Sequence, residues 1–266
     1  GAWMTSHPVP RKISFTGSVA SGKLVAAAAV PDLKRTTLEL GGNDPAIVLD
    51  DADPAEIADK LFWGAFANNG QACSAIKRVY VPERLHDDLV DALAEKARSV
   101  VVGDGMTEGV ELGPLNNRPQ FERVSHLVAD AVAGGATVVA GGRAREGAGY
   151  FYEPTILTNV SEGSAIVDEE QFGPALPVIS YRDIDDVIER ANATNFGLSG
   201  SVWSTDPERA AALARQLECG TAWVNTHLAV SPSQPFGGAK WSGIGVENGL
   251  WGLYGFTDIQ TIHVAR

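Results

Sequence analysis

Apolar and polar positions along the chain follow two different periods, which predicts strands and helices in alternation. Short runs rich in apolar and β-branched residues are typical of strands, and they cover residues 12–16, 38–40, 46–49, 78–81, 137–140, 199–203 and 221–224. Between them, apolar residues recur at intervals of three and four, which predicts helices over residues 21–30, 54–67, 85–97 and 121–131 and after Asp183 and Asp206. Such alternation favours right-handed crossovers and a largely parallel sheet covered on both faces. The predicted class is α/β.

Several helix boundaries are marked by residues with a known capping role. The segment Asp53-Pro54-Ala55-Glu56 combines an N-cap, a proline at the first helical position and an acid at the capping-box position. Asp183 and Asp206 precede two further helices, and Gly134-Gly135 ends the helix before the strand at 137–140. These residues predict helix ends independently of the apolar pattern.

Composition and charge exclude several classes of protein. The 266 residues are 44% hydrophobic and 20% charged, as in ordinary globular proteins, so disordered and coiled-coil classes are excluded. The 21 basic and 33 acidic residues give a net charge of −12, which repels phosphate backbones and anionic membrane surfaces. We therefore expect neither nucleic acid nor a membrane as a partner.

Cysteine and histidine usage narrows the setting further. The two cysteines, Cys73 and Cys219, do not form a disulfide framework and suit a reducing compartment. No apolar stretch reaches about 18 residues, and the first residues have no features of a secretory signal. We expect a cytoplasmic protein. The five histidines share no metal-ligand spacing, so no metal site is predicted.

A glycine-rich turn lies between the first strand and the first helix. The segment Phe15–Lys23 has glycines five positions apart followed by lysine, which approaches a nucleotide-binding P-loop. The next residue is Leu24 rather than the Ser or Thr that would hold magnesium, so nucleotide hydrolysis is disfavoured. Two interpretations remain: backbone N–H groups at Ser18 and beyond bind a phosphate oxygen, or the turn binds nothing.

Two further positions are candidates for chemistry. Cys73 follows a glycine among small residues near a predicted helix start, where exposed amides could ionise a thiol, although free cysteines are more often packing residues. Cys219 lies between an amphipathic helix and a strand and is interpreted as structural. Glu39 ends an apolar strand, where desolvation would raise its pKa and suit it to act as a general base. A solvated strand end is the alternative for Glu39.

Short motifs in register along nearly the whole chain resemble the aldehyde dehydrogenase superfamily. They are Phe15-Thr16-Gly17-Ser18, Leu38-Glu39-Leu40-Gly41-Gly42, Gly70-Gln71-Ala72-Cys73, Glu169-Glu170-Gln171-Phe172-Gly173-Pro174, Asn195-Phe196-Gly197-Leu198, Trp223-Val224-Asn225 and Pro235–Gly243. Members of this family look roughly twice as long, and the chain resembles their C-terminal, catalytic portion. The resemblance implies a three-layer α/β/α catalytic domain with a mainly parallel sheet, preceded by a remnant of a Rossmann-like cofactor domain.

The resemblance also implies the domain limits. Residues 1–41 would be the remnant of the NAD(P)-binding domain, residues 42–250 the catalytic domain, and residues 251–266 a C-terminal strand segment used in oligomerisation. A homodimer or homotetramer is therefore expected.

The resemblance assigns a role to each candidate residue. Cys73 would be the nucleophile that forms a thiohemiacetal and then a thioester, and Glu39 the base that activates water. The cofactor, NAD or NADP, would contact Gly17, Ser18, Leu40, Glu170 and Phe172. The aldehyde would lie among Ala67, Ala72, Ser74, Val230 and Phe236, which are uncharged and favour apolar aldehydes.

The family's upstream oxyanion asparagine and its adenosine-ribose residues have no counterpart in the chain, so weak or absent activity of the chain alone is expected. Two other functions stay open at this stage. One is a non-redox scaffold that oligomerises. The other is thiol-dependent esterase activity.

Overall fold

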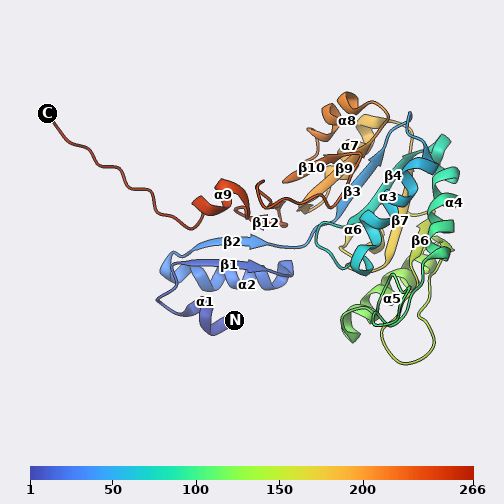
Figure 1. Ribbon diagram of the computed structural model, residues 1–266, viewed down its shortest axis with the longest axis horizontal. Helices are drawn as coiled ribbons and strands as arrows, with labels where there is room; N and C mark the ends of the chain where they lie inside the picture. Colours follow the sequence, from blue (N-terminus) through green and yellow to red (C-terminus); the bar gives the residue numbers. More distant parts are fainter.

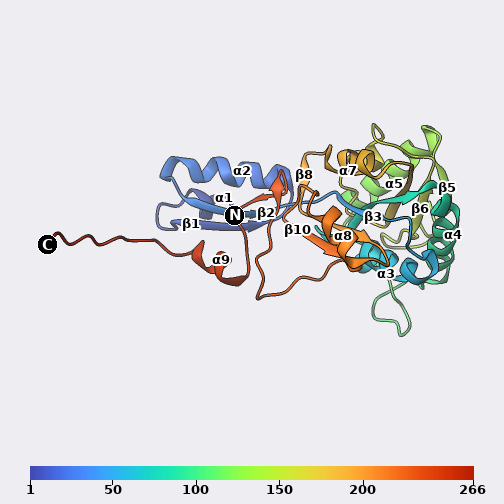
Figure 2. The same ribbon diagram turned by 90° about the horizontal axis from the view of Figure 1, so that it is seen from above.

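The computed structural model describes all residues 1–266, and they form two sheets of unequal size (Figure 1). The larger sheet has seven strands in the order β10-β9-β3-β4-β7-β6-β5, and the smaller has three in the order β1-β2-β12. A short pair, β8 with β11, is hydrogen-bonded to neither sheet. Figure 2 shows the small sheet extending to one side of the large one.

The strands of the structure have the following bounds. They are β1 Lys12–Thr16, β2 Arg35–Glu39, β3 Asp44–Val48, β4 Ile76–Pro82, β5 Thr137–Ala140, β6 Thr155–Thr158, β7 Ala175–Tyr181, β8 Phe196–Gly197, β9 Ser199–Trp203, β10 Thr221–Val224, β11 Ala239–Lys240 and β12 Gly243–Ile244. The longer helices are α2 Val19–Ala29, α3 Pro54–Phe66, α4 Glu83–Ser99, α5 Arg118–Ala133, α7 Ile184–Asn192 and α8 Pro207–Ala214. The shorter ones are α1 Ala2–Ser6, α6 Ala165–Asp168 and α9 Gly249–Tyr254, with 3₁₀ turns η1 Val30–Asp32 and η2 Ala67–Gly70.

The large sheet buries a separate apolar core on each face. One core combines Ala46 and Val48 of β3 with side chains of α3 and α4. The other combines the alternate residues Ile47 and Leu49 with side chains of α5, α7 and α8. Successive side chains of a strand point to opposite faces, so β3 contributes to both cores. This confirms the predicted three-layer α/β/α arrangement, with parallel pairing throughout the large sheet except between β5 and β6.

The small sheet joins residues from both ends of the chain. Strands β1 and β2 pair in parallel, and β12 pairs antiparallel with β2, which places Gly243 opposite Glu39. Helix α2 packs on this sheet so closely that a Cβ at Gly22 would overlap the side chain of Leu40. The expected domain limits assign residues 243–244 to the catalytic domain, 42–250. In the structure, these residues form the third strand of the small sheet, whose other strands belong to residues 1–41.

The predicted helix caps are confirmed. The Asp53 carboxylate accepts the N–H of Ala55 at 2.9 Å, and Asp183 and Asp206 cap α7 and α8 in the same way. The helix after Asp53 ends at Phe66 rather than Ala67. Strand β3 begins at Asp44, two residues before the predicted apolar run.

The C-terminal segment, expected to be a strand used in oligomerisation, is not a strand within the single chain. Beyond α9 no residue is in a strand, and Ile259, Ile262 and Val264 are 97, 80 and 79% exposed. Figure 1 shows this segment running away from the body of the molecule. A strand needs a neighbour to pair with, and nothing in the chain supplies one.

None of the helices combines the length and the apolar character that a membrane span requires.

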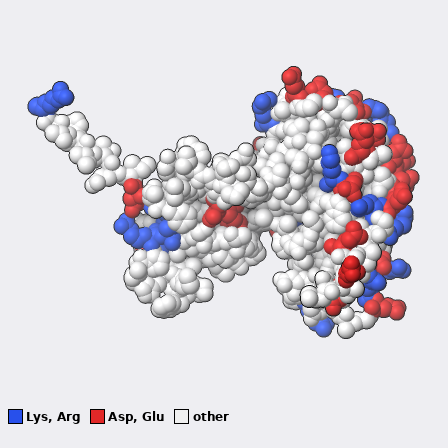
Figure 3. Space-filling view, viewed as in Figure 1, with Lys and Arg blue, Asp and Glu red and all other residues white.

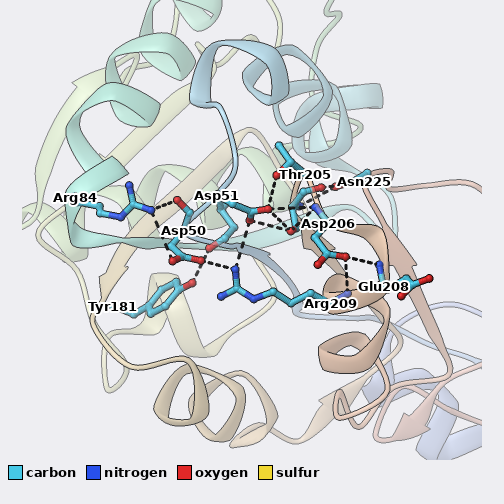
Figure 4. Close-up of polar contacts among 11 residues, drawn as sticks. Asp50, Asp51, Arg84, Tyr181, Thr205, Asp206, Glu208, Arg209 and Asn225 are labelled. Atoms are coloured by element: carbon cyan, nitrogen blue, oxygen red, sulfur yellow. Dashed lines mark hydrogen bonds and ion pairs between the residues drawn. The ribbon is translucent and has the colours of Figure 1, made fainter.

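The carboxyl edge of the large sheet is held together by ion pairs (Figure 4). Asp50, two residues after β3, pairs with Arg209 at 2.6 Å and with Arg84 at 3.8 Å. Asp51 accepts hydrogen bonds from the hydroxyl groups of Ser204 and Thr205. A surface cavity of about 410 Å³ opens beside this cluster. The positive and negative side chains that line the cavity are paired with one another.

On the face seen in Figure 3, charged side chains gather over the part of the molecule that is built on the large sheet.

The contact between Gly220 and Gly237 gives a test of this fold. A Cβ at Gly220 would overlap the carbonyl oxygen of Gly237, and a backbone atom moves aside less easily than a side chain. We expect Gly220→Ala to lower the free energy of unfolding by about 1–3 kcal/mol, measured by urea denaturation. The matched control is Gly105→Ala, which has no atom within 4 Å of the added methyl and should change stability by less than about 0.5 kcal/mol. Equal effects of the two substitutions would contradict this packing.

Candidate active site

Glu39 is a buried carboxylate without a hydrogen-bond donor. It ends β2, is 7% exposed, and neither of its carboxylate oxygens has a partner in the chain. Burial, and secondarily the charge of Glu247, raises the pKa of Glu39 to about 7. A strand end that was solvated would not have this property, so the alternative of a solvated Glu39 is wrong.

Cys73 lies at the opposite edge of the large sheet from the ion pairs of Figure 4. It sits in the turn between η2 and the amino end of β4. No helix begins there, so the expectation that amides of a helix start ionise this thiol is wrong. Burial instead raises the pKa of Cys73, while the positive charge of Lys77 opposes that rise. The N–H of Cys73 makes no hydrogen bond within the chain, so it is free to bind an oxyanion.

The turn before Cys73 has an unusual backbone. Asn68 and Asn69 have φ angles of 52° and 57°, and Gly70 has a φ of 68°. Asparagine and glycine tolerate this left-handed region best. A Cβ at Gly70 would also crowd the carbonyl oxygen of Gly173. The sequence Asn68-Asn69-Gly70 therefore allows the chain to leave α3 and present Cys73.

The connection between β2 and β3 brings three of the motifs together. A Cβ on Gly42 would lie 2.7 Å from the carbonyl oxygen of Cys73, and one on Gly41 would overlap the carboxylate of Glu170. The Gly42 N–H donates to Oε1 of Glu170 at 3.2 Å. Only glycines allow both neighbours to approach, so the Glu39, Cys73 and Glu170 segments converge on this connection.

Glu170 and Phe172 lie in the loop before β7. Burial raises the pKa of Glu170, and Lys77 opposes the rise. Phe172 is half-buried with a φ of 48°, and its carbonyl accepts a hydrogen bond from Gln120 at 2.8 Å. The second carboxylate oxygen of Glu170 makes no recorded hydrogen bond, so it can accept one from a ligand hydroxyl group.

The turn at Gly17 and Ser18 is tied to the end of β2. The N–H of Gly17 donates to the carbonyl of Glu39 at 3.1 Å. The Ser18 hydroxyl caps α2 by accepting the N–H of Ser21, while the N–H groups of Val19 and Ala20 have no acceptor in the chain. Ser18 is exposed, so these two donors suit a phosphate oxygen. Leu40 is only 5% exposed and packs under α2.

The five expected substrate residues fall into two groups. Ala67, Ala72 and Ser74 flank Cys73 in sequence; the first two are half-buried and Ser74 is buried. Val230 and Phe236 follow β10, where Val230 is 47% exposed and Phe236 is half-buried. The two groups are joined through His227, whose Nε2 lies 2.8 Å from the carbonyl oxygen of Ser74.

The structure adds residues that the sequence interpretation left out. The pKa of Cys73 is affected by the charges of Lys77 and Asp44, and that of Glu39 by the charge of Glu247. The turn that carries Cys73 is also contacted by His227. The pair Lys77-Arg78 inside an apolar strand was a detectable signal, because buried charges need partners. Asp44 and His227 had no comparable signal, since their partners are distant in sequence.

A sequence model of the aldehyde dehydrogenase family matches residues 1–262. The chain belongs to the aldehyde dehydrogenase family. It is 40% identical over 268 residues to a betaine aldehyde dehydrogenase of Brucella anthropi, covering 99% of this chain and 55% of that protein. It is 39% identical to human aldehyde dehydrogenase 1A1, covering 99% of this chain and 53% of that protein. The chain thus spans about half the length of these relatives.

Solved structures of the aldehyde dehydrogenase family share this fold. An NAD⁺ complex of an aldehyde dehydrogenase from Bacillus cereus superposes with a TM-score of 0.94 at 40% identity, over 97% of this chain and 52% of that one. An NADP-dependent enzyme of E. coli gives a TM-score of 0.93 at 38% identity, over 96% and 53%. No group of three or more His, Cys, Asp or Glu side chains that could hold a metal is present in the structure.

The raised pKa of Glu39 predicts a pH-dependent stability. The ordinary value is 4.5 and the folded value about 7, so the folded protein keeps a proton that the unfolded chain releases. The free energy of unfolding therefore falls as the pH rises from about 4.5 to about 7. Above pH 7 the folded protein carries the full destabilisation from the buried, ionised Glu39 carboxylate. We expect Glu39→Gln to unfold at a higher temperature than the unchanged chain at pH 8, and the two midpoints to converge near pH 4.

The control for this experiment is Glu95→Gln, at an exposed site with no ion pair. Its midpoint should differ from that of the unchanged chain by the same amount at both pH values. A Glu39→Gln midpoint that tracks this control would show that Glu39 is solvated in the folded protein.

Proposed function

We propose that this chain carries the catalytic region of an enzyme that oxidises an aldehyde to a carboxylic acid with NAD⁺ or NADP⁺. The observation that carries the proposal is the convergence of the Glu39 and Cys73 segments on one buried connection. Cys73 offers a thiol and a free N–H, and Glu39 offers a carboxylate whose pKa is about 7. A nucleophile, an oxyanion donor and a base are the groups that acyl chemistry requires.

The first half of the reaction belongs to Cys73. Its thiolate adds to the aldehyde carbon, and the oxygen of the resulting thiohemiacetal accepts a hydrogen bond from the Cys73 N–H. Loss of hydride from that carbon leaves a thioester on Cys73. NAD(P)⁺, when bound, supplies the hydride acceptor.

The second half belongs to Glu39. Its carboxylate removes a proton from water, and the hydroxide equivalent attacks the thioester carbon to release the carboxylic acid and the thiol. A base works best when its pKa lies near the working pH. Burial brings Glu39 to that range.

Five residues would hold the cofactor. The free N–H groups after Ser18 suit the pyrophosphate, and Gly17 leaves room for it. The unpaired Glu170 oxygen suits a ribose hydroxyl group, and Phe172 would border the nicotinamide. Leu40 would contact the cofactor from its place directly after the end of β2. These features fit a dinucleotide, and the similar Bacillus cereus enzyme was solved as an NAD⁺ complex.

The domain division that accompanies this function is 1–41 for the cofactor-domain remnant, 42–250 for the catalytic domain and 251–266 for the oligomerisation segment. We place the enzyme in the cytoplasm, which the two unpaired cysteines support. The substrate is an aldehyde. The Brucella anthropi relative is named for betaine aldehyde, whereas the uncharged residues Ala67, Ala72, Ser74, Val230 and Phe236 favour apolar aldehydes.

The function is tested at the thiol. An activated ester such as p-nitrophenyl acetate should acylate Cys73, and peptide mapping by mass spectrometry locates the acyl group. Cys73→Ala should abolish acylation and all aldehyde-dependent reduction of NAD(P)⁺. Cys219→Ala, the matched control, should retain both, because burial raises the pKa of Cys219 to about 12. Acylation at Cys219 with Cys73 untouched would refute the proposal.

The same assay measures what the chain does alone. Losing one of two oxyanion donors costs on the order of 10²–10³ in rate, and the family's asparagine donor has no counterpart in the chain. We expect turnover far below the roughly 10 s⁻¹ of ordinary enzymes.

We also propose that the chain associates as a homodimer or homotetramer. Exposed apolar side chains are concentrated at the C-terminal end: Leu250, Trp251, Leu253, Tyr254, Phe256, Ile259, Ile262 and Val264. Contiguous exposed apolar surface of this kind marks interaction sites. Light scattering at micromolar concentration should give a mass of at least twice 28.0 kDa. Removal of residues 257–266 should shift the mass to the monomer, and a monomeric unchanged chain would contradict the proposal.

A further inference from the structure

Four consecutive backbone carbonyls around the nucleophile are held by two side chains from elsewhere in the fold. Lys77 Nζ donates to the carbonyls of Ala72 at 2.8 Å, Cys73 at 3.2 Å and Ala75 at 3.2 Å. His227 Nε2 lies 2.8 Å from the remaining carbonyl, that of Ser74. No carbonyl from residue 72 to residue 75 is left without one of these two partners.

The Lys77 ammonium is committed to this loop. The residue is 2% exposed, and an ammonium has three protons to donate. Its three hydrogen bonds all end on carbonyls of the nucleophile turn, and no carboxylate lies within 4 Å of it to form a salt bridge. A buried charge this well satisfied fixes the geometry of the groups that satisfy it.

The direction of each hydrogen bond at His227 is fixed by its neighbours. The indole Nε1 of Trp203 can only donate, and it donates to the hydroxyl oxygen of Ser201 at 2.9 Å. The Ser201 hydroxyl proton is then directed to Nδ1 of His227, 2.9 Å away. The imidazole therefore carries its proton on Nε2 and donates it to the carbonyl of Ser74, which can only accept. Burial lowers the pKa of His227 to about 3, so the ring is neutral.

The hydrogen bonds of the turn leave one group of the nucleophile free, the N–H of Cys73. Because the carbonyls of the turn are all engaged, the peptide planes around Cys73 are fixed. The Cys73 N–H, by contrast, has no acceptor in the chain. The same two side chains that hold the carbonyls thus hold the N–H in the orientation that an oxyanion would use.

Lys77 has an electrostatic effect that His227 does not have. The charged groups that act on the Cys73 thiol are Lys77 from β4, Asp44 from β3 and Glu170 from the loop before β7. Of these only Lys77 is positive, and it lowers the pKa of Cys73 against burial and the two acids. The neutral imidazole of His227 contributes geometry alone.

We propose that Lys77 and His227 are the positioning residues of the nucleophile, with His227 orienting the turn and Lys77 both orienting it and favouring its thiolate. The proposal rests on the proposed function only in taking Cys73 as the nucleophile. It concerns the reactivity of that thiol and needs no bound cofactor.

The test is the pH dependence of Cys73 alkylation by iodoacetamide, followed by peptide mapping on the 266-residue chain. Lys77→Met should move the midpoint of the profile upward by about one unit or more, so that the rate at pH 7 falls about tenfold or more. His227→Phe should lower the rate several-fold at every pH with the midpoint unchanged, and His227→Gln, which keeps a donor, should recover part of that loss.

The matched control is Lys240→Met, which removes a surface ammonium paired with Glu218 and should leave the Cys73 profile unchanged. Circular dichroism and the unfolding midpoint of each variant establish that it is folded. If Lys77→Met does not fold, Lys77→Arg decides: it keeps the charge but cannot place one small ammonium among three carbonyls. That variant should then alkylate more slowly at an unchanged midpoint.

A Lys77 variant that alkylates at the rate and midpoint of the unchanged chain would overturn the role of Lys77. Likewise, His227→Phe at the unchanged rate would overturn the role of His227. Either result is distinguishable from failure of the proposed function, because that would appear in the unchanged chain as an ester that does not acylate Cys73.

Discussion

The burial of one short connection, residues 40–44, is the constraint on which the rest of the structure depends. All five residues are buried, so each backbone polar group there needs a partner. Leu40 N–H donates to the carbonyl of Ser242, and Gly42 N–H to Glu170. The carbonyl of Asn43 accepts two hydrogen bonds from the guanidinium of Arg78. Satisfying this connection therefore draws the C-terminal segment, the loop before β7 and strand β4 to one place.

The same connection brings the segments of the proposed nucleophile and the proposed base together. It leaves the small sheet at Glu39 and enters the large sheet at Asp44, with two glycines between that allow close approach of Cys73 and Glu170. A larger residue at Gly42 would push away the turn that carries the Cys73 thiol, and one at Gly41 would displace the carboxylate of Glu170. The spacing between the proposed nucleophile and the proposed base is thus governed by backbone packing rather than by either side chain.

What the sequence predicted was governed by local physics. Asp53, Asp183 and Asp206 cap helices with their own neighbours, so α3, α7 and α8 could be placed from sequence. Asp44 was missed as the start of β3 because its burial is compensated by Ser199, which lies 155 residues away.

The environment of Cys73 was misjudged because burial by the fold, rather than a local helix start, governs its thiol. Neighbouring residues suggested a helix start, whereas burial and Lys77 set the pKa. The burial of Cys73 depends on segments distant in sequence, including Asp44 and Glu170, whereas Lys77 lies only four residues away and was overlooked as a partner.

The acidic groups around Cys73 affect one another's pKa values, and this influences when the Cys73 thiol ionises. Burial raises the pKa of Asp44 to about 7 and also raises those of Cys73 and Glu170. Lys77 is a positive charge that lowers all three, and it cannot balance three negative charges at once. Since Asp44 raises the pKa of Cys73, the thiolate is most favourable while Asp44 keeps its proton. The ionisation of Cys73, the proposed nucleophile, therefore depends on the protonation of Asp44 as well as on burial and Lys77.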